Sequence, residues 1–227
     1  MARKINKSAG QKRKEPVDVL IKRNIRAGKY VPGQRLVEID LIREFGVSQR
    51  QVRDALRRLE SEGLVSIEKN RGATVRLISR AELLCILDVL DSLSLLAVQQ
   101  AITNISEKNK RIVESSLAAS KKFRKQSATE KKVYKYLDEN VRFWDSIASV
   151  VDNPILWSIR ERLETLLFRI RVQGILIDSD PDKWITHHEE ILMAILDHNT
   201  KLAQQLVLEA SADVREVILA LSDEVFT

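Results

Sequence analysis

Three arginines recur at helical spacing in the first quarter of the chain. Arg50, Arg53 and Arg57 are separated by three and four residues, so they share one face of an α-helix over residues 49–62. The apolar side chains of that segment form a separate stripe, which consists of Val52, Ala55, Leu56 and Leu59. A guanidinium group presents a fork of N–H donors that matches guanine O6 and N7 or phosphate oxygens. The pattern indicates a helix that packs against the protein by one face and presents cations to a polyanion on the other. The alternative is that the arginines only form a charged face exposed to solvent.

Turn and cap residues bound this helix. Ser48-Gln49-Arg50-Gln51 has the spacing of a capping box, in which the serine hydroxyl accepts a backbone N–H and the glutamine reaches back. Gly63 stands where a left-handed residue ends a helix. Polar groups of Ser48 and Gln49 lie at the helix start, where hydroxyl, amide or backbone N–H groups can reach phosphates.

The surrounding elements predict a winged helix-turn-helix over residues 15–78. Helices are expected from Pro16 to before Gly28 and over residues 38–45, because apolar residues recur there at helical spacing. Two alternating runs, residues 64–68 and 73–77, predict a β-hairpin with a basic tip at Lys69-Asn70-Arg71-Gly72. In such a module the basic helix enters the major groove of DNA, while Arg71 and Gly72 approach the minor groove or the backbone.

Charge is unevenly distributed along the 227 residues. Residues 1–79 carry a net charge of +10 and the remainder −4, so the first part is expected to face a polyanion. Residues 1–14 are basic and poor in apolar side chains, and we predict a disordered tail. A single cysteine and the absence of a membrane-spanning apolar run predict a cytoplasmic protein without a membrane partner.

After residue 79 the chain is expected to be entirely helical, which makes the protein mainly α. Six segments have helical patterns, near residues 80–103, 107–125, 129–151, 154–177, 182–197 and 199–222. They predict a bundle of six or seven helices over residues 80–223. The first segment is apolar nearly all round, so it must be covered on several sides, with a dimer contact as one cover. Cys85 in this segment is expected to be inert core.

The first module resembles the GntR family of bacterial regulators. The matching features run from PG-x-R-L through E-x-x-L, GVS and V-R-x-AL-x-x-L to EGL and RGA-x-V, over residues 17–78. The resemblance implies DNA contacts from Ser48, Gln49, Arg50, Arg53 and Gly72. Arg35 of the first motif, Arg57 and Arg71 complete the predicted DNA-binding set. Gln49-Arg50-Gln51 departs from the usual Arg-Thr-Pro, so we expect the preferred bases to differ.

The second module resembles the FadR-type branch of that family. The resemblance rests on residues 140–144, 153–156 and 188–195 and on those from Ala203 onward. The resemblance implies a cavity for a metabolite, often a carboxylic acid, and in many members a divalent metal held by one aspartate and three histidines. The positions that match those ligands are Asn140, Trp144, His188 and Ala210. One ligand does not make a zinc or nickel site, so we predict no metal and no cofactor here.

Loss of the metal does not remove the cavity. Asn140, Trp144 and His188 are expected to line it, although Trp144 as a core plug and His188 as a hydrogen-bonded core histidine are the alternatives. Arg169 lies within an apolar run and is a candidate for an anionic effector, or else it extends its charged head to solvent.

Together the two modules predict a ligand-responsive, sequence-specific DNA-binding transcription regulator, with repression as the usual outcome. Paired half-sites need paired heads, so we expect a homodimer on an inverted repeat. An architectural DNA binder without effector control is the alternative, and it would bind with a steep salt dependence and little sequence preference. The chain contains no phosphate-cradling glycine loop, nucleophile elbow or Cys/His pairing, so no enzymatic activity is expected.

Overall fold

A computed structural model describes residues 15–26, 29–69, 71–124, 132–177 and 182–226. Inside the helices, the side chains of residues 26, 132–135, 137 and 168–177 are also outside the description. The chain divides into two compact units, Met1–Arg76 and Leu77–Thr227, and each is considered by itself. The predicted disordered tail, residues 1–14, lies outside the described residues.

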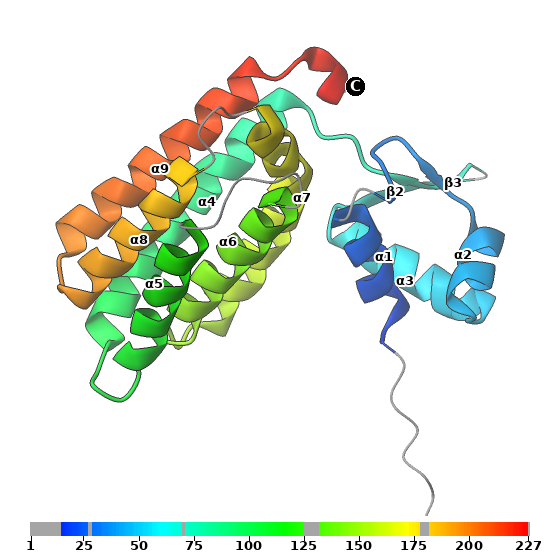
Figure 1. The fold of residues 1–227 in the computed structure, drawn as a ribbon. Helices are drawn as coiled ribbons and strands as arrows, with labels where there is room; N and C mark the ends of the chain where they lie inside the picture. Colours follow the sequence, from blue (N-terminus) through cyan, green and yellow to red (C-terminus); the bar gives the residue numbers. More distant parts are fainter. Residues whose placement is uncertain (1–14, 27–28, 70, 125–131, 178–181, 227) are drawn as a thin grey trace, which may run out of the picture. The chain divides into compact units, whose positions relative to one another are not determined.

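The first unit is a winged helix-turn-helix, as predicted (Figure 1). Its described elements are α1 (Val17–Arg26), β1 (Arg35–Leu36), α2 (Glu38–Phe45), α3 (Gln49–Ser61), β2 (Val65–Glu68) and β3 (Gly72–Val75). The sheet is antiparallel in the order β1-β3-β2, so the predicted hairpin carries a third strand. That strand was not predicted, because two residues are too few to show an alternating pattern.

The apolar face of α3 is the core of this unit. Val52 and Leu59 are fully buried, as is Ile21 of α1. Two ion pairs link α1 to α3 at the edge of this contact, Arg58–Asp18 at 2.8 Å and Lys22–Glu62 at 2.5 Å. The packing fixes the rotation of α3 about its axis and therefore the direction of its arginines.

The short connection from α2 to α3 contains a cap for each helix, at the C-terminus of α2 and at the N-terminus of α3. Gly46 has a φ of 62°, and its N–H donates to Ile42 O of the last turn of α2. Ser48 then caps α3 by the predicted capping box, since its hydroxyl accepts from Gln51 N and its own N–H donates to Gln51 Oε1. The two helices thus turn within three residues, Gly46, Val47 and Ser48.

Glu44 anchors the end of α2 to the segment that follows α1. It accepts hydrogen bonds from Lys29 Nζ at 2.5 Å, Tyr30 Oη at 2.8 Å and Asn24 Nδ2 at 3.1 Å. Burial raises the pKa of Tyr30 to about 12.

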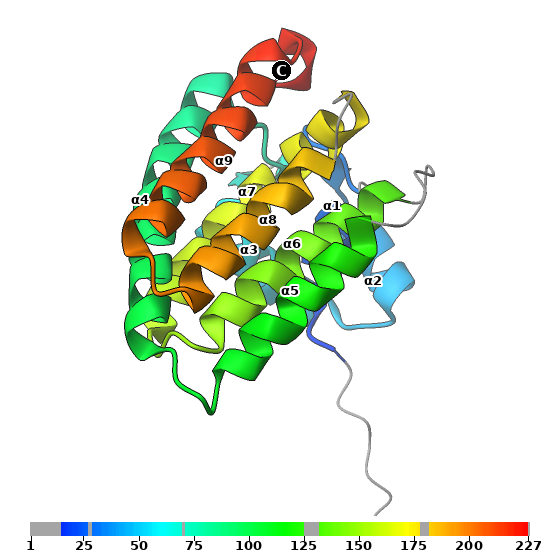
Figure 2. The ribbon, with the colours of Figure 1, turned by 60° about the vertical axis from the view of Figure 1, so that its left-hand side comes forward.

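The second unit is all-α among the described residues. It contains α4 (Arg80–Asn104), α5 (Lys110–Arg124), α6 (Lys132–Ala148), α7 (Pro154–Ile177), α8 (Asp182–Leu196), α9 (Thr200–Ala220) and a 3₁₀ turn at Asp223–Val225. Figure 2 shows α9 between α4 and α8, and α5 on the far side of α8. Helices α6 and α7 pack against each other and against α4. The predicted helical bundle is confirmed.

Helix α4 is covered by several neighbours, as its apolar sequence requires. It packs against α6, α7, α8 and α9 and buries nine of its side chains. The expectation that Cys85 is core was wrong, because this side chain is exposed together with Val89 and Leu96. These residues lie four and seven positions apart on one stripe of α4, and an apolar composition alone does not tell which stripe remains uncovered.

None of the helices described in either unit combines the length and the apolar character needed to cross a bilayer.

Candidate DNA interface and effector cavity

The exposed face of α3 carries the predicted DNA-contacting side chains. Gln49, Arg50, Arg53 and Arg57 are all exposed. Arg50 is held only loosely, because its side chain is 91% exposed and its contact with Asp54 is 3.8 Å long. The structure therefore brings four polar side chains to the first three turns of one helix face, which is the geometry that enters a major groove.

Glu38, the first residue of α2, holds two of these side chains. Arg53 Nε lies 3.0 Å from both Glu38 carboxylate oxygens, and Gln49 Nε2 donates to Oε2 at 3.0 Å. The hydrogen bonds from Arg53 and then Gln49 lower the pKa of Glu38. Sequence reasoning missed this residue, since an acidic side chain in the first turn of a helix is commonplace and carries no other signal.

Ser48 is already engaged within its own helix. Its hydroxyl donates to Gln51 Oε1 at 2.9 Å and its backbone N–H donates to the same oxygen at 3.0 Å. The predicted phosphate contact of Ser48 would compete with this capping box, whose first role is to begin α3.

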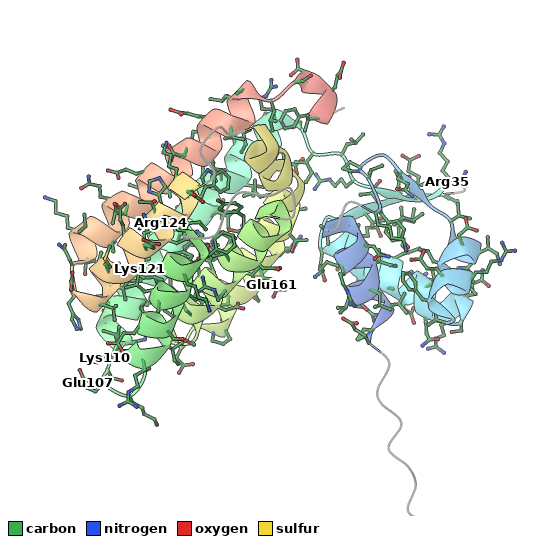
Figure 3. All side chains as sticks on the ribbon, in the orientation of Figure 1. Arg35, Glu107, Lys110, Lys121, Arg124 and Glu161 are labelled. Carbon is green, nitrogen blue, oxygen red and sulfur yellow. The ribbon has the colours of Figure 1, made fainter. Side chains whose placement is uncertain are left out.

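The wing brings Arg35 beside Gly72. Gly72 has a φ of 87°, a left-handed conformation that favours glycine, and a Cβ there would lie 3.7 Å from Arg35 Nε. Figure 3 shows the Arg35 side chain next to the sheet. The Arg71 side chain is 82% exposed and pairs with Glu68 at 3.2 Å. The wing tip therefore presents a cation whose ion pair with Glu68 is open to solvent.

The second unit contains a cavity of about 70 Å³ between α4, α6, α7, α8 and α9. Its lining includes Asn140, Trp144 and His188, as predicted, and also Ala210. The four positions therefore come together from three helices. The further lining residues are Leu87, Leu90, Asp91, Ser94, Phe143, Arg160, Glu164, Trp184, His187, Ile191, Val207, Ser211, Asp213 and Val214.

His188 is fixed by a buried carboxylate on α6. Its ring stacks on Phe143 at a centroid distance of 4.0 Å, and Nδ1 lies 2.5 Å from Glu139 Oε2. Glu139 also accepts from Ser120 Oγ at 2.7 Å and Arg142 Nη2 at 2.9 Å. Burial acts to raise the pKa of Glu139, but His188 and the other donors outweigh it and the pKa is lowered.

Arg160 is a buried cation that sequence reasoning missed. Its guanidinium lies 3.5 Å from the Trp144 ring centroid and pairs with Glu164 at 2.7 Å. Trp144 therefore lines the cavity and supports a cation, which goes beyond the core plug weighed from sequence. Only the i,i+4 spacing of Arg160 and Glu164 could have signalled the pair. The Arg169 side chain lies outside the described residues.

Two polar atoms on the cavity wall lack a hydrogen-bond partner within the described part of the chain. They are Ser211 Oγ and His187 Nδ1, both buried. His187 Nε2 lies 2.7 Å from Asp213 Oδ2, so in the neutral ring Nε2 donates and Nδ1 is left as an acceptor. Buried polar groups of this kind are normally satisfied by water or by a ligand.

Each of the two units matches the model of a known protein family. Residues 14–75 match the model described as bacterial regulatory proteins of the gntR family, and residues 85–211 match the FCD domain. The chain belongs to the GntR family. It is thus a DNA-binding transcription regulator with an FCD effector-binding domain.

Relatives of this GntR-family chain cover most of its length. An uncharacterized HTH-type transcriptional regulator of Bacillus subtilis, YdhC, is 24% identical over 83% of each chain. The HTH-type transcriptional repressor RspR of Escherichia coli is 23% identical over 90% of this chain and 88% of its own. The E. coli McbR/YncC structure superposes with a TM-score of 0.73 at 20% identity, covering 89% of this chain and 95% of its own, and shares the fold.

The metal implied by the FadR-type resemblance does not fit these residues. Ala210 has no donor atom, the Trp144 indole is a hydrogen-bond donor only, and Asn140 is a neutral amide where the family has a carboxylate, so His188 is the single family ligand that remains. No group of three or more His, Cys, Asp and Glu side chains with metal-binding geometry occurs among the described residues.

Replacing Arg53 by alanine should weaken binding to a preferred DNA sequence by about 1–3 kcal/mol and reduce discrimination between bases. The reason is that the guanidinium N–H groups that donate to a base edge are removed. Fluorescence anisotropy on a duplex enriched by the wild-type protein measures the change. Arg43→Ala is the control, since Arg43 is an exposed arginine on α2 outside the predicted set. Unchanged affinity of the Arg53 variant would rule out a base-reading role.

Proposed function

We propose that this GntR-family regulator reads an operator with α3 and the wing and changes its DNA affinity when a small molecule occupies the cavity in the second unit. The DNA-binding part rests on four exposed polar side chains on α3, whose opposite face is buried, and two of these side chains are held by Glu38. The effector part rests on a cavity between five helices with two polar atoms on its wall that are unsatisfied within the described residues, Ser211 Oγ and His187 Nδ1. Repression is the proposed outcome, by analogy with the related E. coli repressor RspR.

The proposed operator is an inverted repeat bound by a homodimer in the cytoplasm. One helix of 13 residues contacts a single half-site, and two-fold symmetry pairs two such helices on a palindrome. The rival is an architectural DNA binder, for which the exposed arginines would supply only sequence-independent affinity.

We propose no enzymatic activity. Ser211, His187 and Asp213 are residue types of a hydrolytic triad, and Asp213 does orient His187. However, neither Ser211 Oγ nor His187 Nδ1 has a hydrogen-bond partner in the described structure, so the serine is not activated by the imidazole.

Selection of genomic fragments by the purified full-length chain at physiological salt tests the DNA proposal. Enrichment of an inverted repeat is expected, because two base-reading helices related by symmetry select two related half-sites. If binding instead fades with salt and no motif emerges, the architectural function replaces this one.

The effector proposed is a small carboxylic acid. A cavity of about 70 Å³ admits a compact molecule. Arg160, supported by Trp144, is the cation that such an acid would meet, and Ser211 could donate a hydrogen bond. The ligand regulates only if it binds the DNA-competent and the incompetent conformations unequally.

Filling the cavity should uncouple sensing from DNA binding. Ala210→Phe places a ring in the lining of the cavity, so small acids such as acetate and lactate should no longer raise the melting temperature or alter operator affinity. Ala212→Phe on the exposed face of α9 is the matched control and should respond like the wild type. An Ala210→Phe protein that still responds would place the effector elsewhere.

Purified, untagged protein should contain less than one equivalent of metal by elemental analysis. The combined variant Asn140→Asp, Trp144→His and Ala210→His should gain stoichiometric zinc or nickel binding by calorimetry, because it adds three ligands beside His188. The wild-type chain titrated in parallel is the control. One tightly held ion per wild-type chain would contradict the metal-free proposal.

A further inference from the structure

We propose that Glu38 is a positioning residue for base recognition, which holds Arg53 and Gln49 in the orientation that reads DNA. The inference rests on the proposed sequence-specific function. It assigns specificity to a carboxylate on α2, a helix whose own side chains are not in the predicted DNA-contacting set.

The hydrogen bonds to Glu38 use only one of the three guanidinium nitrogen atoms of Arg53. Both carboxylate oxygens lie 3.0 Å from Nε. The two terminal nitrogens are left for an end-on, bidentate contact with guanine O6 and N7. Gln49, one turn earlier on α3, is held through Nε2 on the same carboxylate, which leaves its amide oxygen as the group that can accept from a base.

Stability does not account for this arrangement. The Arg53 side chain is 57% exposed and that of Glu38 is 34% exposed, and ion pairs this open to water add little to folding. The contact between α2 and α3 has its own apolar core, which includes Leu41 and Val52. What the carboxylate does restrict is the freedom of a long side chain, and that restriction matters when the side chain must meet one base edge.

Arg50, on the same helix, contrasts with Arg53 because no carboxylate in the described part of the chain binds it within hydrogen-bonding distance. Its side chain is 91% exposed, and its Nε lies 3.8 Å from Asp54 Oδ2, which is beyond hydrogen-bonding distance. We therefore assign base discrimination chiefly to Arg53 and Gln49, and a less selective contact to Arg50.

A carboxylate at a DNA-binding face opposes phosphate binding, which makes the inference sharply testable. Removing the charge of Glu38 should strengthen binding to any duplex, since one repulsion with the phosphates is lost. The same change should weaken binding to the preferred sequence, since a neutral amide with one acceptor oxygen holds Arg53 and Gln49 less firmly than the two carboxylate oxygens do. A residue with a purely structural role would not move the two affinities in opposite directions.

The experiment compares Glu38→Gln with Asp40→Asn in the full-length protein. Both changes remove one negative charge from the first turn of α2, but Asp40 has only a 3.9 Å contact with Arg43 and none with α3. Affinities for a wild-type-selected duplex and for an unrelated duplex are measured across a salt series. Melting temperatures are recorded to confirm that both variants are folded.

We expect Glu38→Gln to bind the preferred duplex about tenfold more weakly, within the range of one bidentate base contact, and the unrelated duplex about twofold more tightly. Asp40→Asn should keep the wild-type ratio of the two affinities. In the Arg53→Ala background, Glu38→Gln should lose most of its effect on that ratio, because the group that Glu38 positions is gone.

A Glu38→Gln protein with the wild-type affinity ratio would overturn the inference, as would an equal loss of discrimination in Asp40→Asn. An undiminished Glu38→Gln effect in the Arg53→Ala background would also overturn it. Failure of the proposed function is distinguishable, because in that case the wild-type protein itself would not prefer any sequence.

Discussion

Burial of the apolar stripe of α3 is the contact on which the DNA-binding unit depends. Val52 and Leu59 are fully enclosed and pack with Ile21 of α1, so α3 cannot rotate without exposing them. Because the arginines occupy the other side of the same helix, their outward direction follows from this burial. The ion pairs from Asp18 and Lys22 lie at the edge of the contact and refine the position of a helix already held by apolar packing.

A different constraint governs the second unit, where charged groups are buried and must be compensated. Glu139 is 3% exposed and has donors from α5, α6 and α8. Arg160 is 4% exposed and lies between an aromatic ring and a carboxylate. A buried charge without such partners costs several kcal/mol, so the cavity wall is organised by these pairings. Beside these paired charges, Ser211 Oγ and His187 Nδ1 are buried on the same wall without a hydrogen-bond partner among the described residues.

The Glu139 network also suggests how an occupied cavity can affect the rest of the bundle. His188 lines the cavity on α8, and its partner Glu139 on α6 bonds Ser120 of α5. A ligand that displaces the imidazole therefore changes hydrogen bonds on three helices at once. Such a rearrangement is what a bound molecule needs in order to distinguish two conformations of the protein.

Local patterns in the sequence determined the elements and the family. Helical spacing located α3 and its arginines, the Ser48-x-x-Gln51 box located its start, and the motifs from PG-x-R-L to RGA-x-V indicated the GntR family. Only the tertiary structure showed the partners that come from other elements. Glu38 reaches Arg53 from α2, Glu139 reaches His188 across the bundle, β1 pairs across the sheet with β3, and Cys85 lies on an uncovered stripe. These contacts join residues far apart in the chain, and a periodicity reports only the face of an element, never the neighbour that the fold places against it.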